Sequence, residues 1–241
     1  MVRQPIVFSD IDFTIVFDSE LDAGTAALIE EVRKRARFIL VTARSRRECE
    51  PLPPIPNDGL IAENGADIWF RRNGEDLLDE DWHREMSVFQ PVVYEFRDRL
   101  ERMGWRIHPK LHSFSSCIER SGKTDRDVEW VQSNLPEGVQ LDFSRNTSGR
   151  YIEVFPALAG KDKAVLRLCD YIGVPVDNTL GMGDNSNDMP MLRTVGMPLA
   201  PGNCHPDVRA LVLRRGGFVS PREGHPGAQD MLGRAIQLLE G

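Results

Sequence analysis

The strongest signal for the fold of this 241-residue chain is the stretch Ile6-Val7-Phe8-Ser9-Asp10-Ile11-Asp12-Phe13-Thr14. An apolar run opens it, and two carboxylates, those of Asp10 and Asp12, follow directly. Short apolar runs of this kind are typical of buried parallel strands, and the residues after such strands gather at the carboxyl edge of the sheet. The stretch therefore predicts a strand of an open α/β sheet that delivers acidic side chains to the edge where such sheets build their sites.

A second acidic cluster follows another apolar strand near the opposite end of the chain. Thr179-Leu180-Gly181-Met182 leads into Gly183-Asp184-Asn185-Ser186-Asn187-Asp188. In a parallel sheet both clusters reach the same edge, where their carboxylates would repel one another unless a cation lay among them. Hard oxygen ligands suit Mg²⁺. We therefore expect a magnesium site, with Asp184 as a direct ligand and Asp188 either as a ligand through water or as a partner that orients a lysine.

Strand and helix signals alternate in the first and last parts of the chain. Strand patterns cover 5–10, 37–42, 59–62, 66–70 and 75–78, and helical spacing covers 21–35 and 45–50. The pair Asn73-Gly74 is a hairpin signal. Later, strands at 179–182, 196–200 and 217–219 alternate with helices at 161–172, 188–193, 205–212 and 227–239. This alternation predicts an α/β fold with a doubly wound parallel sheet.

The pattern changes in the middle of the chain. A helix at 88–103 precedes strands at 105–108 and 114–119, and a helix at 125–135 precedes strands at 140–144 and 151–155. A helix with two antiparallel strands, repeated once, indicates a small α+β unit. We therefore expect a core formed by 1–82 and 156–241, with an inserted α+β domain at 83–155.

Composition and charge exclude several classes of protein. The formal net charge of −7 argues against a nucleic-acid or anionic-membrane binder. No apolar run reaches the ~20 residues of a membrane span, and the first residues do not resemble a signal peptide. The four cysteines lie far apart without a CxxC pair, as in reduced cytosolic proteins. We expect a cytoplasmic protein that is a monomer or a homodimer.

Several of these residues suit the transfer of a phosphoryl group. Asp10 beside a metal ion can attack phosphorus, and Asp12 can protonate the leaving alcohol. Thr42, at the end of a predicted strand, offers a hydroxyl to phosphoryl oxygens, although helix capping alone is enough to explain it. Lys161 begins a helix, where the helix dipole disfavours a cation, so its place makes sense if it neutralises phosphate and nucleophile. Lys163 is the alternative for this role, but it should face elsewhere.

Taken in order, these segments resemble the four motifs of the haloacid dehalogenase superfamily of phosphohydrolases. The motifs are Asp10-Ile11-Asp12-Phe13-Thr14, Thr42, Lys161 and Gly183-Asp184-Asn185-Ser186-Asn187-Asp188. Glu63-Asn64-Gly65-Ala66, the stretch from Glu153-Val154-Phe155-Pro156 to Lys161, and Ala200-Pro201-Gly202-Asn203 are similar to the Cof-type branch. The resemblance covers essentially the whole chain. It implies a Rossmann-like core and makes the insert a cap, similar to those of sucrose-phosphate, mannosyl-3-phosphoglycerate, trehalose-phosphate and archaeal phosphoglycolate phosphatases.

The resemblance also assigns roles to residues. It makes Asp10 the nucleophile and Asp12 the acid/base, with Mg²⁺ bound by Asp10, the backbone carbonyl of Asp12 and Asp184, and supported by Asp188. The residues expected to bind substrate are Thr42, Arg44, Asn64, Lys110, Arg150, Lys161 and Asn187. Phe13 departs from the pattern, because glycine is usual there. Its ring can narrow the pocket or alter the local turn, which bears on the range of substrates more than on the class of reaction.

The cap of this family closes over the leaving group, which excludes water and supplies specificity. Polar candidates on or beside the predicted cap strands are Lys110, His112, Ser113, Ser115, Arg145 and Arg150. Arginines there would suit a carboxylate or second phosphate, and serines or histidine would suit sugar hydroxyls. Lys110 and Arg150 are the favoured candidates.

Together, the residues and the resemblance predict a Mg²⁺-dependent phosphomonoesterase that forms an aspartyl phosphate. Its substrate would be a small metabolite of the sugar phosphate or phosphoglycerate/phosphoglycolate type. A phosphomutase of the phosphomannomutase type is the alternative, since it shares this kind of cap. A non-catalytic phospho-acceptor or interaction module is disfavoured, because receiver domains lack the insert and the second acidic cluster.

Overall fold

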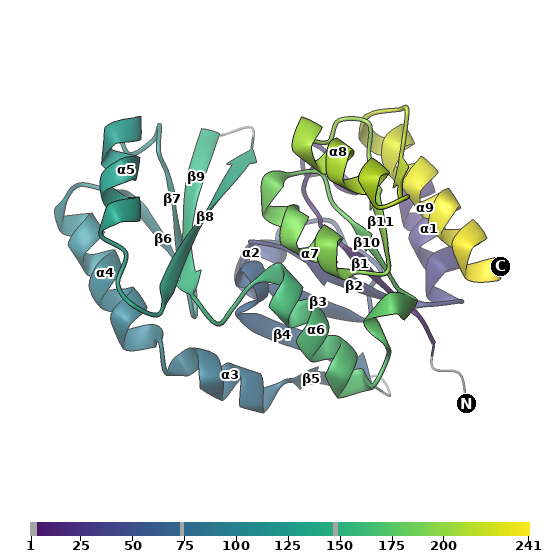
Figure 1. The fold of residues 1–241 in the computed structure, drawn as a ribbon, viewed down its shortest axis with the longest axis horizontal. Coiled ribbons are helices and arrows are strands. Elements are labelled where there is room, and N and C mark those ends of the chain that lie inside the picture. Colours follow the sequence, from purple (N-terminus) through teal and green to yellow (C-terminus); the bar gives the residue numbers. More distant parts are fainter. Residues whose placement is uncertain (1–3, 73–74, 147–148) are drawn as a thin grey trace.

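The structure is a computed structural model that describes residues 4–72, 75–146 and 149–241, so the predicted hairpin pair Asn73-Gly74 lies outside the described residues. Two lobes lie side by side, each built around its own sheet (Figure 1). The described residues begin and end on the larger lobe, on the side away from the smaller one (Figure 1). The smaller lobe is therefore inserted into the larger one.

The larger lobe contains an eight-stranded sheet in the order β12-β11-β10-β1-β2-β3-β4-β5. Its strands are β1 (Ile6–Ser9), β2 (Arg37–Val41), β3 (Gly59–Ala62), β4 (Asp67–Arg72), β5 (Glu75–Leu78), β10 (Thr179–Met182), β11 (Met197–Ala200) and β12 (Phe218–Val219). The six strands from β12 to β3 are parallel, and β4 and β5 extend the sheet as antiparallel strands. This confirms the predicted α/β fold with a parallel sheet.

Helices cover both faces of this sheet. They are α1 (Ala23–Arg33), α2 (Arg46–Cys49), α3 (Glu80–Ser87), α6 (Lys161–Ile172), α7 (Met189–Thr194), α8 (Pro206–Arg214) and α9 (Gly224–Glu240). Every residue of β1 is buried, and alternate side chains enter different cores. Ile6 and Phe8 pack in the cluster that contains residues of α6, α7 and α8, whereas Val7 packs in the cluster that contains residues of α1 and α9. Burial on both faces explains why β1 is a continuous apolar run rather than an alternating one.

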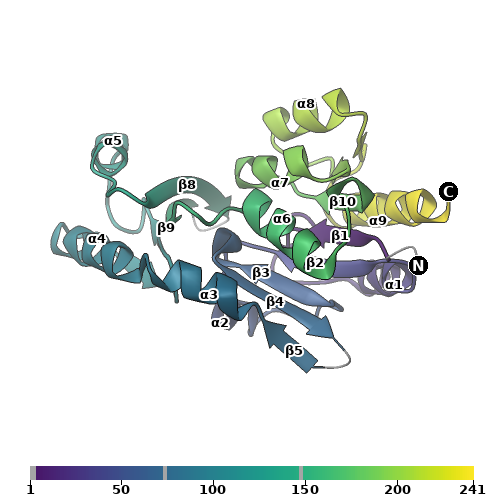
Figure 2. The ribbon, with the colours of Figure 1, turned by 60° about the horizontal axis from the view of Figure 1, so that its bottom comes forward.

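The smaller lobe is a four-stranded antiparallel sheet with two helices. It consists of α4 (Gln90–Arg102), β6 (Ile107–Pro109), β7 (Phe114–Cys117), α5 (Asp125–Ser133), β8 (Val139–Asn146) and β9 (Gly149–Pro156), with the strand order β6-β7-β9-β8. A separate apolar cluster joins the helices to the sheet, including Phe96 of α4, Val131 of α5 and Ile152 of β9. The helices lie on the outer side, and the sheet lies between them and the larger lobe (Figure 2). The other face of this sheet is therefore turned toward the larger lobe.

The helix predicted at 88–103 differs in the structure. Instead of a single helix at 88–103, the structure contains α3 and α4, separated by Val88 and Phe89. Asp79 caps α3 by accepting the backbone N–H of Trp82 at 3.0 Å, and Trp82 is buried against the larger lobe. Because only two α3 side chains, those of Trp82 and Met86, are buried, the apolar spacing of this helix is too sparse to predict it. Within the described residues, no helix has the length and apolar character needed to cross a membrane.

Candidate active site

Three acidic residues meet at the carboxyl edge of the larger sheet. Strands β1 and β10 are paired so that Ser9 lies opposite Met182, and the backbone N–H of Asp10 donates to the carbonyl of Met182 at 2.9 Å. This register brings the residues after both strands to one place. One carboxylate oxygen from each of Asp10, Asp184 and Asp188 lies within 4.8 Å of the others. The two sequence clusters therefore form a single acidic site.

Lys161 reaches this acidic site from the first turn of α6. Its Nζ lies 2.8 Å from Oδ1 of Asp10 and 2.6 Å from Oδ1 of Asp188, and its side chain is buried. Lys163 donates instead to the carbonyls of Ala157 and Ala159. Of the two lysines considered from the sequence, the structure brings only Lys161 to the acidic site.

The tight start of α6 depends on a close approach between two backbone segments. A Cβ atom on Gly65 would lie 2.3 Å from the carbonyl oxygen of Gly160, and Gly65 has a φ of +100°. Only glycine fits this position without a shift of the backbone. The turn at 63–65 therefore fixes where Lys161 enters the site.

The charges at this edge are not balanced by the protein alone. Burial raises the pKa of Asp10 to about 7, and the charge of Asp188 acts in the same direction while Lys161 opposes it. Burial also raises the pKa of Asp184 well above its ordinary value, with further contributions from Asp188 and Asp10. Burial opposes the charge of Lys161, but Asp10 and Asp188 outweigh it and raise the lysine pKa. Three carboxylates facing one ammonium leave room for a further cation.

Hydrogen bonds of Asp188 and Thr14 fix the positions of the groups in the acidic site. Oδ2 of Asp188 accepts the backbone N–H groups of Asp184 and Asn185 at 3.1 and 3.0 Å. The hydroxyl of Thr14 lies 3.0 Å from Oδ1 of Asp184 and 3.3 Å from Oδ2 of Asp10. Asp188 therefore orients both the lysine and the turn that carries Asp184, which is one of the two roles considered from the sequence.

Asp12 lies beside this group and is bound by an arginine. Arg44 donates from Nε to Oδ2 and from Nη2 to Oδ1 of Asp12, at 2.7 and 2.8 Å. The backbone N–H of Arg44 also donates to the hydroxyl of Thr42, which follows β2 and is buried. All three residues line the same pocket. The predicted residues Asp12, Thr42 and Arg44 are therefore brought together.

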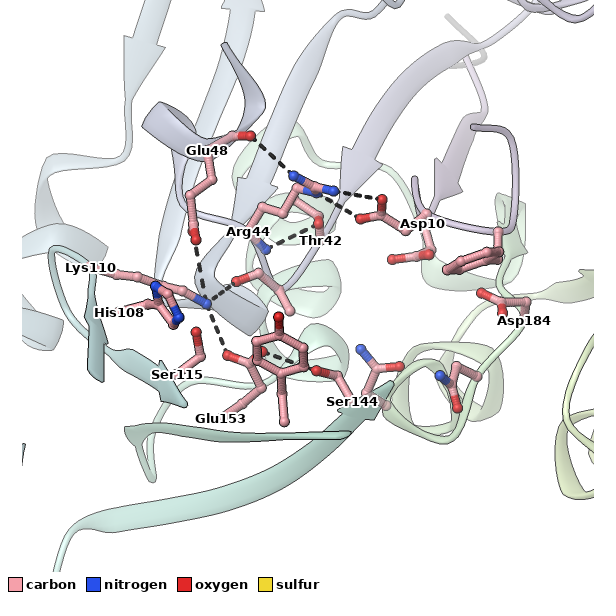
Figure 3. Close-up of a pocket in the computed structure, with 16 residues that line it drawn as sticks. Asp10, Thr42, Arg44, Glu48, His108, Lys110, Ser115, Ser144, Glu153 and Asp184 are labelled. Atoms are coloured by element: carbon pink, nitrogen blue, oxygen red, sulfur yellow. Dashed lines mark hydrogen bonds and ion pairs between the residues drawn. The ribbon is translucent and has the colours of Figure 1, made fainter. Parts of the chain in front are cut away.

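The pocket has a volume of about 230 Å³ and lies between the two lobes. The larger lobe contributes Asp10, Asp12, Phe13, Thr42, Ala43, Arg44, Glu48, Asp184, Asn185 and Asn187, and the smaller lobe contributes His108, Lys110, Ser115, Ser144, Tyr151 and Glu153 (Figure 3). Of the predicted candidates in the smaller lobe, Lys110 and Ser115 line it. A pocket shared in this way can hold the reacting group at one end and the rest of a ligand at the other.

Four pocket residues of the smaller lobe were not predicted as site residues: His108, Ser144, Tyr151 and Glu153. A signal was available for two of them. Tyr151 and Glu153 alternate along β9 with Ile152 and Val154, which are buried in the apolar cluster. Because successive strand residues point to opposite faces, this alternation places Tyr151 and Glu153 together on the other face.

The same alternation corrects the prediction for Arg150. Its guanidinium lies outside the pocket and donates to Glu119 and Asp125 at 2.8 and 2.7 Å. It is one position from Tyr151 on β9, so it faces the opposite side. Arg150 therefore forms surface ion pairs and does not line the pocket.

Two other candidates of the smaller lobe dock it against the larger one. Glu63 accepts the backbone N–H groups of Leu111 and His112, both at 2.9 Å, and the hydroxyl of Ser113 at 2.8 Å. His112 and Ser113 are buried in this contact and do not line the pocket. The side chain of Arg145 lies outside what the structure describes.

Asn64 and Asn187 mark a second cavity behind the acidic site. Asn64 donates its backbone N–H to the carbonyl of Thr42 at 3.0 Å and lines a cavity of about 300 Å³ together with Lys161 and Asn187. Asn187 lines both cavities, whereas Asn64 lines only the second. Asn64 therefore lies outside the pocket between the lobes, and its contact with substrate stays a prediction.

Sequence comparisons relate the chain to known hydrolases. The sequence model of the haloacid dehalogenase-like hydrolases matches residues 104–213. A phosphoglycolate phosphatase of Methanopyrus kandleri is 33% identical over 218 residues, which are 86% of this chain and 88% of that protein. A putative phosphatase of Haemophilus influenzae is 39% identical over 239 residues, which are 84% of this chain and 88% of that protein.

A structural comparison agrees with the fold. The solved sucrose-phosphatase of Synechocystis, in complex with sucrose and phosphate, has a TM-score of 0.73 and covers 99% of both chains at 19% identity. The two-lobed arrangement is thus shared with a solved structure over nearly the whole length.

Proposed function

The chain belongs to the haloacid dehalogenase-like hydrolase family, and from that premise we propose that it is a Mg²⁺-dependent phosphomonoesterase acting on a small phosphorylated metabolite. The sugar phosphate and phosphoglycerate/phosphoglycolate types are the candidate substrates. The observation that carries the proposal is the buried contact of Lys161 with Asp10 at 2.8 Å, beside Asp184 and under a pocket of about 230 Å³. That volume suits a small molecule rather than a polymer.

The residues at the acidic site fit a magnesium ion. Their donors are carboxylate oxygens, and burial followed by the neighbouring carboxylates raises the pKa values of Asp10 and Asp184, so a cation would favour their charged forms. Asp10, Asp184 and the backbone carbonyl of Asp12 would hold the ion, with Asp188 in support. When bound, the ion neutralises charge on the nucleophile and on the phosphoryl oxygens.

The side chains then have distinct roles. A carboxylate oxygen of Asp10 attacks phosphorus, an aspartyl phosphate forms, and the bond from phosphorus to the leaving oxygen breaks as Asp12 supplies a proton to that oxygen. A water molecule next attacks the aspartyl phosphate, Asp12 takes its proton, and inorganic phosphate leaves with Asp10 restored. Lys161 fixes the orientation of Asp10, and Thr42 offers its hydroxyl to the phosphoryl oxygens from the end of β2.

The test is release of inorganic phosphate from a panel of phosphorylated metabolites, with and without Mg²⁺. The substitution Asp10→Asn keeps the size of the side chain but removes the nucleophile, so turnover should fall by about a thousandfold or more while the fold is retained. The matched control is Asp81→Asn, an exposed site on α3, which should behave like the wild type. Turnover that survives Asp10→Asn, or formation of an isomeric phosphate ester instead of free phosphate, would contradict the proposal.

A further inference from the structure

The end of the pocket away from the acidic site is built around a buried ion pair. Nζ of Lys110, just after β6, lies 2.9 Å from Oε2 of Glu153 on β9, and the side chains are 3% and 8% exposed. Both residues line the pocket. Because burial strengthens electrostatic effects, the charges of this ion pair act strongly on any charged ligand group at this end of the pocket.

The ammonium group of Lys110 has little left to offer a ligand. It donates to the carbonyl of Ala43 at 2.7 Å as well as to Glu153, and Oε2 of Glu48 lies 4.0 Å from the same nitrogen (Figure 3). An ammonium has three N–H donors. Two of the three are therefore used within the protein, and the charge of Lys110 faces two carboxylates.

The charge at this end is negative. The carboxylates of Glu48, Glu153 and Asp12 face two cations, Lys110 and Arg44, which leaves an excess of one carboxylate. Among the described residues that line the pocket, Arg44 is the other Lys or Arg side chain. Its Nε and Nη2 donate to the two carboxylate oxygens of Asp12. A carboxylate on the leaving group would thus meet like charges, and His108 is the one further basic side chain among the described residues of the lining.

The same surface is well suited to hydroxyl groups. Oε1 of Glu153 accepts the hydroxyl of Ser144 at 3.0 Å, and the hydroxyl of Ser115 lies on the same face of the sheet. Carboxylate and hydroxyl oxygens can accept hydrogen bonds from alcohols, and hydroxyls can also donate. Tyr151 and Phe13 add aromatic surface to the lining, which can contact the C–H groups of a polyol.

We propose that the leaving group is an uncharged polyhydroxylated alcohol and that Glu153, balanced by Lys110, excludes leaving groups that carry a carboxylate. This inference rests on the proposed phosphatase function and selects between its two candidate substrate types. Glu153 is a specificity-determining residue at the end of the pocket away from the acidic site.

The experiment compares two substrates that differ in one group. Glycerol 3-phosphate and 3-phosphoglycerate have the same carbon skeleton, with CH₂OH in the first where the second has a carboxylate. For the wild type with Mg²⁺, kcat/KM should be about tenfold or more higher for glycerol 3-phosphate. In Glu153→Gln, which keeps shape but removes the charge, this ratio should fall by about tenfold, through a lower KM for 3-phosphoglycerate.

A control variant separates specificity from structural damage. Glu119→Gln changes an exposed glutamate of the same lobe that binds Arg150 and does not line the pocket, so the ratio should stay at the wild-type value. Equal losses on both substrates in Glu153→Gln would indicate a structural role and overturn the proposal.

Hydrolysis of p-nitrophenyl phosphate distinguishes failure of the inference on the leaving group from failure of the proposed phosphatase function. If the wild type hydrolyses it in a manner that depends on Asp10 but uses 3-phosphoglycerate as well as or better than glycerol 3-phosphate, the inference on the leaving group is wrong and the phosphatase function stands. If it hydrolyses none of the three esters with Mg²⁺, the proposed function itself is wrong.

Discussion

Nζ of Lys161 lies 2.8 Å from Oδ1 of Asp10, although the two residues are 151 positions apart in the chain. The same amine lies 2.6 Å from Asp188, so one buried lysine bridges carboxylates that follow two different strands. The substitution Lys161→Met would leave both acids buried without a counter-charge. We expect the free energy of unfolding to fall by about 3–5 kcal/mol in urea titrations, and turnover to be lost.

Lys163→Met is the matched control for this prediction. Its amine donates only to the carbonyls of Ala157 and Ala159 in a partly buried position. Loss of these bonds should lower the free energy of unfolding by about 1 kcal/mol and leave turnover close to that of the wild type. Equal effects of the two substitutions would contradict the role assigned to Lys161.

Glu63 should control how firmly the smaller lobe docks on the larger one. In Glu63→Gln a single carbonyl oxygen replaces two carboxylate oxygens that together accept from Leu111, His112 and Ser113. We expect a loss of about 2–3 kcal/mol in stability and faster hydrogen exchange of the amides of Leu111 and His112. The control is Glu31→Gln, at a half-exposed site on α1, and unchanged exchange of these two amides in Glu63→Gln would refute the docking role.

His112 should make the protein acid-sensitive. Burial, with a smaller effect from His83, lowers the pKa of His112 from 6.5 to about 4, so the unfolded chain binds more protons between these values. Stability should therefore rise with pH across this window and be lost as pH falls through it, by up to about 3 kcal/mol.

Thermal unfolding between pH 4 and pH 7 measures this dependence. His112→Asn should flatten the acid limb, because the titrating group is gone, whereas His205→Asn, at a half-exposed site, should leave it unchanged. An acid limb of the same steepness in His112→Asn would assign the effect to other groups.

Phe13 combines backbone strain with a place in the pocket. Its φ is +58°, in the left-handed region that favours glycine, and its ring meets that of Phe17 edge-on at 6.4 Å. Phe13→Gly relieves strain while losing the ring contact, so stability should change by less than about 1 kcal/mol. Phe13→Ala loses the ring but keeps the strain and should be less stable than Phe13→Gly by about 1 kcal/mol. If the ring narrows the pocket, 1-naphthyl phosphate should gain in kcat/KM relative to p-nitrophenyl phosphate in both variants.

Binding of Mg²⁺ should stabilise the fold through Asp184. At a concentration one hundred times its dissociation constant, the ion should raise the free energy of unfolding by about 2.7 kcal/mol. Since the pKa of Asp10 is raised to about 7, the ion competes with protons, and its effect should be larger at pH 8 than at pH 6. Chelation should remove this stabilisation. The same Mg²⁺-dependent gain in Asp184→Asn would place the ion elsewhere.

Much of the fold and the acidic site could be predicted from the sequence because their signals are local. Apolar runs such as Ile6–Ser9 identify strands buried on both faces, and the carboxylates of Asp10 and Asp184 follow such runs directly. Parallel pairing then requires that these residues meet at one edge. The preference for Lys161 over Lys163 also followed from a local feature, the place of a cation in the first turn of a helix.

The residues that form the end of the pocket away from the acidic site could be identified only from the tertiary structure. Lys110 and Arg150 were equally suitable from the sequence, yet one is buried against Glu153 and the other pairs with Glu119 and Asp125 on the surface. The face on which a strand residue points, and what lies opposite, depends on register and on how two lobes dock, and both are set by contacts between residues far apart in the chain. Short sequence segments therefore determine the chemistry at the sheet edge. The proposed choice of leaving group depends instead on packing between residues that are far apart in the chain.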